Sequence, residues 1–141
     1  MKPFLARSRA RAWALHLLYA WEMSDRDSLT EFTEAALRHR RVSPRHRPYL
    51  EVLVARLDEH LAEIDGLLQS HILNWRLERL AAIDRNILRL GVVELRYVEE
   101  VPGKVAITEA IGLAERYGSD DSGAFVNGVL DSVYREAAIA G

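Results

Sequence analysis

Three arginines near the amino terminus have the type and spacing of a phosphate-binding cluster. Arg7, Arg9 and Arg11 alternate with small residues, and Lys2 adds a cation just before them. We expect the first helix to begin at about Ser8, which would set these charges at its amino-terminal end. The helix dipole opposes positive charge there by about 0.3–1 kcal/mol per residue, so helix stability does not account for them. Guanidinium groups bind phosphate in a bidentate geometry. The cluster therefore favours a phosphate ligand over the alternative of a frayed, solvated terminus.

A second basic run occupies residues 38–47. Its cations are Arg38, His39, Arg40, Arg41, Arg45, His46 and Arg47. No acidic residue lies between Ala35 and Leu50. The dipole of a preceding helix would stabilise cations at its carboxyl end, and this explains the first arginines as well as an RNA ligand does. Whether the run extends an RNA path stays open.

Aromatic side chains are the second requirement for binding unpaired RNA, because bases stack on them at about 1–3 kcal/mol per base. Tyr19 follows the arginine cluster on the same predicted helix, and Phe125 opens the last one. Either ring could face RNA or the core. Trp13, Trp21 and Trp75 are interpreted as core residues, since large aromatic side chains are mostly buried.

Charge is divided unevenly along the 141 residues. Residues 1–50 hold ten Lys and Arg against five Asp and Glu, a net of +5. Residues 51–141 hold nine against sixteen, a net of −7, so the formal charge of the chain is −2. Such a chain could present a basic end to a polyanion and an acidic end to a cationic partner, although chance also produces this asymmetry.

The residue constellations that enzymes need are missing. The five histidines include no HExxH pair, and no glycine-rich phosphate loop occurs. The absence of cysteine excludes disulfides, thiolate nucleophiles and thiolate metal sites. We expect neither catalysis nor a metal or cofactor. No apolar run approaches the roughly 20 residues of a bilayer span, so we expect a cytoplasmic protein without a membrane partner.

Hydrophobic spacing predicts an all-α protein, a single compact domain of about seven helices. Its two helical-bundle halves are expected at residues 1–70 and 71–141. Ser28 or Asp27 should cap the second helix, and Ser43-Pro44 or Pro48 should open the third. Gly118 is placed to end the sixth helix in the left-handed conformation. The predicted helices cover about residues 8–23, 28–40, 44–67, 75–80, 84–98 and 104–117, with the last one beginning near Ser122.

Several stretches of the chain resemble the NusB family of bacterial transcription antitermination factors. They are RSRAR at 7–11, LYAW at 18–21, LRLGVVEL at 88–95, VPGKVAITEAI at 101–111 and FVNGVLD at 125–131. The resemblance spans the whole chain in order and length. It implies an all-α fold of two subdomains that pairs with the ribosomal protein NusE and binds boxA, a short single-stranded element of ribosomal RNA leaders. Other Nus factors and RNA polymerase would be contacted indirectly.

The resemblance also implies positions for the two interfaces. The expected RNA-binding residues are Lys2, Arg7, Arg9, Arg11, Tyr19 and Phe125. The expected protein-partner residues are Glu78, Asp84 and Asp121. Ser8 interrupts the family's arginine run, and Ala124 stands where lysine is common, so RNA contacts should be fewer in this chain.

Two other functions are compatible with parts of the sequence. The chain could be a helical protein–protein adaptor whose companion alone contacts RNA. It could also be a stand-alone relative of the NusB-like domain of ribosomal RNA cytosine methyltransferases. Methyl transfer itself is excluded, because the chain has neither a glycine-rich cofactor loop nor a cysteine nucleophile.

Overall fold

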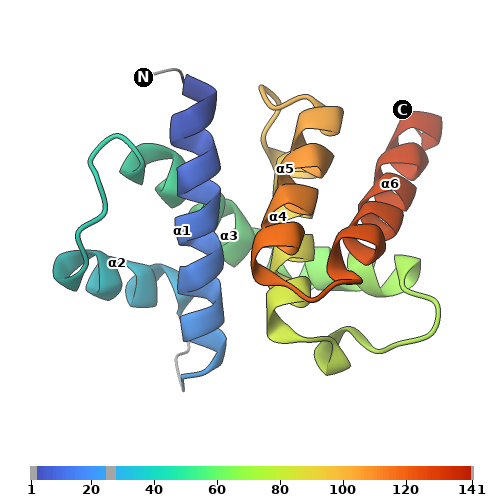
Figure 1. Ribbon diagram of the computed structural model, residues 1–141, viewed down its shortest axis with the longest axis horizontal. Helices are drawn as coiled ribbons and strands as arrows, with labels where there is room; N and C mark the ends of the chain where they lie inside the picture. Colours follow the sequence, from blue (N-terminus) through green and yellow to red (C-terminus); the bar gives the residue numbers. More distant parts are fainter. Residues whose placement is uncertain (1–2, 25–27, 141) are drawn as a thin grey trace. The chain divides into compact units, whose positions relative to one another are not determined.

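The computed structural model describes residues 3–24 and 28–140, and these residues form helices without a strand. The all-α prediction is therefore confirmed. In chain order the elements are α1 (Pro3–Glu22), α2 (Leu29–His39), α3 (Arg47–His71), the short 3-10 helix η1 (Leu77–Arg79), α4 (Ala82–Tyr97), α5 (Gly103–Tyr117) and α6 (Ser122–Ala140) (Figure 1).

The chain divides into two compact units, Met1–Glu59 and His60–Gly141. The boundary falls inside α3, where His60 departs from helical geometry with φ −119° and ψ 18°. We expected the halves to meet near residue 70, at the end of this helix. A kink in the middle of a long helix gives no signal in the hydrophobic spacing, since the stripe continues across it.

The first unit is built around leucines that exclude solvent completely. α1 packs on α2. The fully buried leucines among its described side chains are Leu15, Leu17 and Leu18 of α1, Leu29 of α2, and Leu50, Leu53 and Leu57 of α3. One side of α1 is not covered. Tyr19 is 42% exposed and Met23 60% exposed, so one face of an apolar helix is open to solvent.

The second unit is centred on α4, which packs against both α5 and α6. An unbroken run from Asn86 to Glu94 is buried. Gly91 allows the close approach of α6, because a Cβ atom there would lie 2.5 Å from Cδ1 of Leu130. The buried guanidinium of Arg89 donates to both carboxylate oxygens of Asp65, each at 2.8 Å. This bidentate pair joins α4 to the carboxyl-terminal part of α3.

The predicted helix starts are partly right. The hydroxyl oxygen of Ser28 accepts the backbone N–H of Glu31 at 3.1 Å and caps α2, as expected. α3 begins at Arg47, because a turn in which the N–H of His46 bonds the carbonyl of Ser43 at 2.9 Å precedes it. Pro48 therefore lies in the first turn, where its missing N–H costs nothing.

Two features between the later helices differ from the predictions. The expected helix over 75–80 is only η1, because Gln69 accepts the N–H of Leu77 at 2.7 Å and donates to the carbonyl of Trp75 at 3.0 Å. Trp75 lies in this connection, 63% exposed rather than in the core. Gly118 is extended, with φ −94°. Glycine is needed there for space, since a Cβ atom would collide with Ser122 and lie 2.8 Å from the carbonyl of Ala114.

Candidate nucleic-acid interface

The amino-terminal arginines lie in the second and third turns of α1. The helix begins at Pro3, five residues before the start we expected. Because the helix dipole acts mainly on the first turn, the repulsion that we inferred for these cations is largely absent. The dipole argument for a phosphate ligand is therefore wrong, and the case for one depends on where each side chain lies.

Arg7 and Arg11 share one face of α1 and meet the ring of Tyr49 from α3. Their guanidinium carbons lie 4.8 Å and 5.6 Å from the ring centroid, within the range of a cation–π contact. Arg7 is half-buried. Arg11 is only 4% exposed, so it contributes to packing more than to a ligand surface.

Arg9 lies on a different side of the helix and is exposed. His16, seven residues later, returns to the same side after two turns and is exposed as well. The ring of Trp13 is half-buried and meets His16 edge-on, with centroids 6.5 Å apart at 86°. Tyr19 borders these residues. We define the α1 face as Arg9, Trp13, His16 and Tyr19; it combines a cation with accessible rings, which unpaired RNA requires.

Two members of the α1 face were missed from sequence. Trp13 was interpreted as core, and His16 was not identified as a candidate. The seven-residue interval between Arg9 and His16 was the available signal. The partial exposure of Trp13 depends on tertiary packing, which local sequence does not encode.

The α1 face does not include two further residues that were predicted to bind RNA. Lys2 lies outside the described residues. Phe125 belongs to the second unit, in the first turn of α6, where it is half-buried. Its backbone N–H donates to the carbonyl of Asp121 at 3.1 Å.

The three acidic residues predicted to meet a protein partner differ in their surroundings. Glu78 is exposed, with one oxygen 3.4 Å from Nη1 of Arg76. Asp121 is exposed at the start of α6. The Oδ1 atom of Asp84 accepts a hydrogen bond from the hydroxyl group of Ser122, with 2.7 Å between the two oxygen atoms. Ser122 is 1% exposed, so Asp84 also fastens the beginning of α4 to that of α6.

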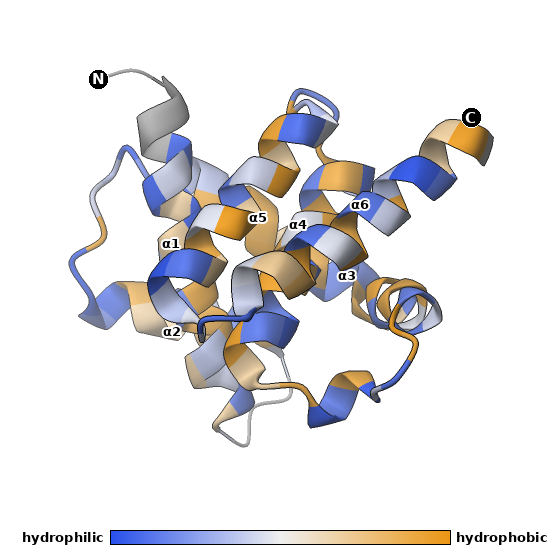
Figure 2. Cartoon of the chain, turned by 45° about the vertical axis from the view of Figure 1, so that its right-hand side comes forward, coloured by the Kyte–Doolittle hydropathy of each residue, from blue (hydrophilic) through white to orange (hydrophobic). Residues whose placement is uncertain are grey.

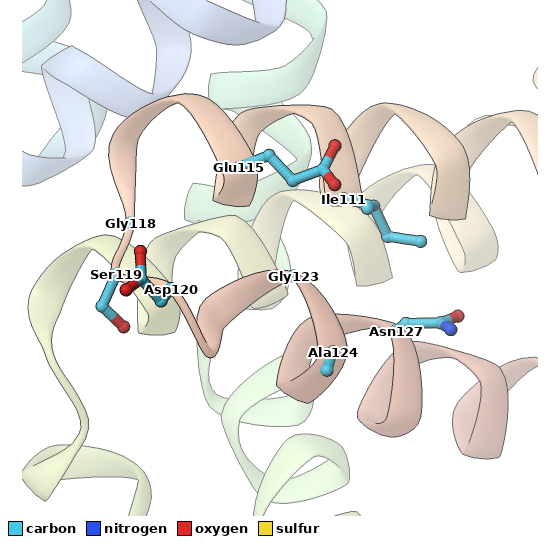
Figure 3. A pocket seen from close by; sticks show the side chains of 8 residues that line it. All are labelled: Ile111, Glu115, Gly118, Ser119, Asp120, Gly123, Ala124 and Asn127. Carbon is cyan, nitrogen blue, oxygen red and sulfur yellow. The ribbon is translucent and has the colours of Figure 1, made fainter.

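An open pocket of about 400 Å³ lies between α5 and α6 (Figure 3). Glu115 and Asp120 bring carboxylates to it, and Asn127 brings an amide. Its lining residues are Ile111, Glu115, Gly118, Ser119, Asp120, Gly123, Ala124 and Asn127. With two carboxylates and no cation in its lining, the pocket suits a basic or amide group better than a phosphate.

Comparison with known proteins identifies the family. The model of the NusB family matches residues 8–135. The chain belongs to the NusB family. It is 44% identical over 128 residues to the transcription antitermination protein NusB of Sorangium cellulosum (strain So ce56), covering 91% of each chain. It is 39% identical over 129 residues to that of Bacillus subtilis (strain 168), covering 92% of this chain and 95% of the relative.

Solved NusB structures have the same fold. T. maritima NusB matches with a TM-score of 0.82 and 34% identity, over 92% of this chain and 91% of that one. A structure of the antitermination factors NusB and NusE in complex with dsRNA matches with a TM-score of 0.80 and 30% identity, over 93% and 97%. Among the described residues of this NusB-family chain, no helix has the length and apolarity to cross a membrane.

Proposed function

We propose that this chain is a transcription antitermination factor that binds boxA RNA of ribosomal RNA leaders together with the ribosomal protein NusE. It would act on RNA polymerase through a complex with other Nus factors. The observation that carries this proposal is the α1 face, where Arg9 and exposed rings share one helix surface. The NusB–NusE–dsRNA complex among similar structures supports it. Access to nascent transcripts requires a cytoplasmic location.

The roles of the individual groups follow from their exposure. Arg9 can pair with a phosphate without first breaking another described contact. Tyr19 and His16 offer ring faces on which bases could stack. Arg7 and Arg11, held against Tyr49, would fix the amino-terminal half of α1 so that Arg9 is presented in one orientation.

The acidic second unit suits a basic ribosomal protein. Glu78 and Asp121 are exposed and could pair with cations of NusE. Asp84 would keep its neighbours in place through Ser122. We include Asp84 in the partner surface because its second carboxylate oxygen remains an acceptor.

We propose a binding role without catalysis. The arrangement in the described residues that comes nearest to a nucleophilic site is Ser132, His71 and Glu136. The Ser132 oxygen lies 2.7 Å from Nδ1 of His71, and Nε2 lies 2.9 Å from Glu136. The latter is an ion-pair distance, but the N–H does not point at the carboxylate, and Nε2 has no hydrogen bond. Ser132 also lies mid-helix in α6, where backbone N–H groups are already bonded and cannot form an oxyanion hole.

The test is a titration of boxA RNA with the chain and NusE, comparing wild type with Arg9→Gln and Tyr19→Ala. Arg9→Gln should weaken binding and lower the slope of log affinity against log salt by about 0.7, for one lost single-strand phosphate contact. Tyr19→Ala should cost about 1–3 kcal/mol. Arg96→Gln, an exposed arginine of α4, is the matched control. If wild type adds nothing to the affinity of NusE for RNA, the adaptor function replaces this one.

A further inference from the structure

The second basic run forms an exposed and well-anchored loop in the first unit. Arg40, Arg41 and Arg45 are all exposed. Val42 and His46, which alternate with them, are 5% exposed each. Hydrogen bonds from the N–H of Val42 to the carbonyl of Arg40 at 3.1 Å and from the N–H of His46 to Ser43 at 2.9 Å fix the backbone. The loop is thus held by its buried residues while its arginines point outward.

Helix capping accounts for the two ends of the run but not for its middle. Arg38 and His39 lie in the last turn of α2, where the dipole stabilises them. Arg47 donates from Nη2 to the carbonyl of Leu37 at 2.8 Å and so caps the same helix. Arg40 and Arg41 follow the helix, and the backbone of Arg40 is extended. Among the described residues neither has an ion pair, and their like charges repel each other.

This loop lies beside the amino-terminal half of α1. Tyr49, four residues after Arg45, is the ring that Arg7 and Arg11 contact from α1. Figure 2 shows that the connection between α2 and α3 is mostly hydrophilic. The loop is therefore next to the Arg7 and Arg11 side of α1. An RNA strand held on the α1 face would have to pass around the helix to reach it.

We propose that Arg40, Arg41 and Arg45 form a second phosphate-binding surface that binds RNA flanking the boxA element. We call these three residues the loop arginines. The proposal rests on the proposed function, because the α1 face must hold boxA for the flanking RNA to reach the loop. Residues 38–48 contain no Phe, Tyr or Trp, and guanidinium groups bind phosphate oxygens in a bidentate geometry, so we expect the loop arginines to contact phosphates. Such contacts position the strand without reading its sequence.

The experiment compares a boxA-length RNA with RNAs extended on either side by sequence of random composition, each titrated with the chain and NusE. For the extension that reaches the loop, Arg40→Gln/Arg41→Gln should weaken binding on the order of tenfold at physiological salt and lower the salt slope by about 1.4, for two lost single-strand contacts. Binding of the boxA-length RNA should not change. The double variant Arg56→Gln/Arg96→Gln removes the same charge from exposed positions elsewhere.

Arg40→Lys/Arg41→Lys, which keeps both charges, should retain most of the affinity and slope. Circular dichroism melts of all variants check folding. Equal affinity of wild type and Arg40→Gln/Arg41→Gln for every extended RNA would overturn the proposal, as would an equal loss on short and extended RNAs. If wild type fails to bind the boxA-length RNA at all, the proposed function itself fails, so the two failures are distinguishable.

Discussion

Arg9 and Arg11 are two residues apart on α1, and they differ in their exposure to solvent. Arg11 is 4% exposed and contacts the ring of Tyr49, whereas Arg9 is exposed. A guanidinium that is taken out of water and held by neighbouring groups contributes to the stability of the fold. One that stays hydrated is available to a ligand.

Alanine substitutions should separate these two tasks. Arg11→Ala should lower the free energy of unfolding by about 1–3 kcal/mol, because it removes a buried group with its packing. Arg9→Ala should change it by less than about 0.5 kcal/mol, as exposed positions do. Urea denaturation measures both. Equal destabilisation by the two substitutions would show that Arg9 is also part of the core.

Tyr97 has an altered acid–base equilibrium. Burial, the hydrogen bond to Glu63 at 3.0 Å and the negative charge of Glu63 raise the pKa of Tyr97 above its ordinary 10.0, while Arg96 opposes the shift. The ring also stacks on that of His60, with centroids 3.9 Å apart. The neutral phenol is therefore favoured in the folded chain.

Replacing Glu63 with Gln should lower the pKa of Tyr97 towards its ordinary value, because it removes the carboxylate charge. In the wild type the pKa of Tyr97 is higher in the folded chain than in the unfolded chain. The contribution of Tyr97 to the free energy of unfolding is therefore complete below the ordinary pKa of tyrosine and is lost as the pH rises through the folded pKa. NMR titration of the labelled tyrosine ring carbons measures the shift, and Tyr97→Phe assigns the signal. An unchanged pKa in Glu63→Gln would exclude Glu63 as a cause.

At the scale of helices, the bidentate pair of Arg89 and Asp65 joins α4 to α3 through two hydrogen bonds of 2.8 Å. Arg89→Ala should cost about 2–4 kcal/mol, somewhat below a fully buried pair because the Asp65 side chain is 30% exposed. Arg135→Ala breaks an exposed pair with Asp131 at 2.9 Å and should cost less than about 1 kcal/mol. Thermal melts of both variants test this, and similar losses would contradict it.

Two helical glycines should respond to substitution in opposite directions. Gly112 in α5 has open space where a Cβ atom would lie, whereas at Gly91 the same atom would collide with Leu130. Gly112→Ala should therefore stabilise the chain by about 0.5–1 kcal/mol through its better helix propensity. Gly91→Ala should destabilise it, typically by about 1–3 kcal/mol, through overpacking. Stabilisation by both substitutions would mean that α6 shifts freely.

The helices were largely predictable from sequence, and the exceptions have physical reasons. The spacing of apolar residues located α2, α4 and α5 closely, and Ser28 marked the start of α2. The start of α1 was missed although Pro3, a residue favoured at the first helical position, signalled it. The exposure of Trp75 was missed because a side-chain bond from Gln69 replaces the helix expected there.

The candidate site was less predictable than the helices. The arginine cluster was recognised from sequence. Arg11 is buried and Arg9 is exposed because of Tyr49, which lies 38 residues after Arg11 in the chain. Helical spacing alone places Arg11 opposite Arg9, and it does not say which of them meets a neighbour. That choice is made by tertiary packing.

At the scale of the whole molecule, charge and exposed rings are divided between two kinds of partner. Residues 1–50 carry a net charge of +5 and include the α1 face and the loop arginines. Residues 51–141 carry −7 and include the exposed carboxylates of Glu78 and Asp121. A chain with this division can hold RNA and a basic protein at once without the two competing for the same groups.

The most direct test of the α1 face is ultraviolet crosslinking of boxA RNA to the assembled complex of this chain with NusE, followed by mass spectrometry of the crosslinked peptides. RNA should attach to α1 peptides that contain Tyr19, and these crosslinks should decline in Tyr19→Ala and Arg9→Gln. Crosslinks confined to NusE, in a complex that still contains this chain, would show that the chain binds its partner and leaves the RNA to it.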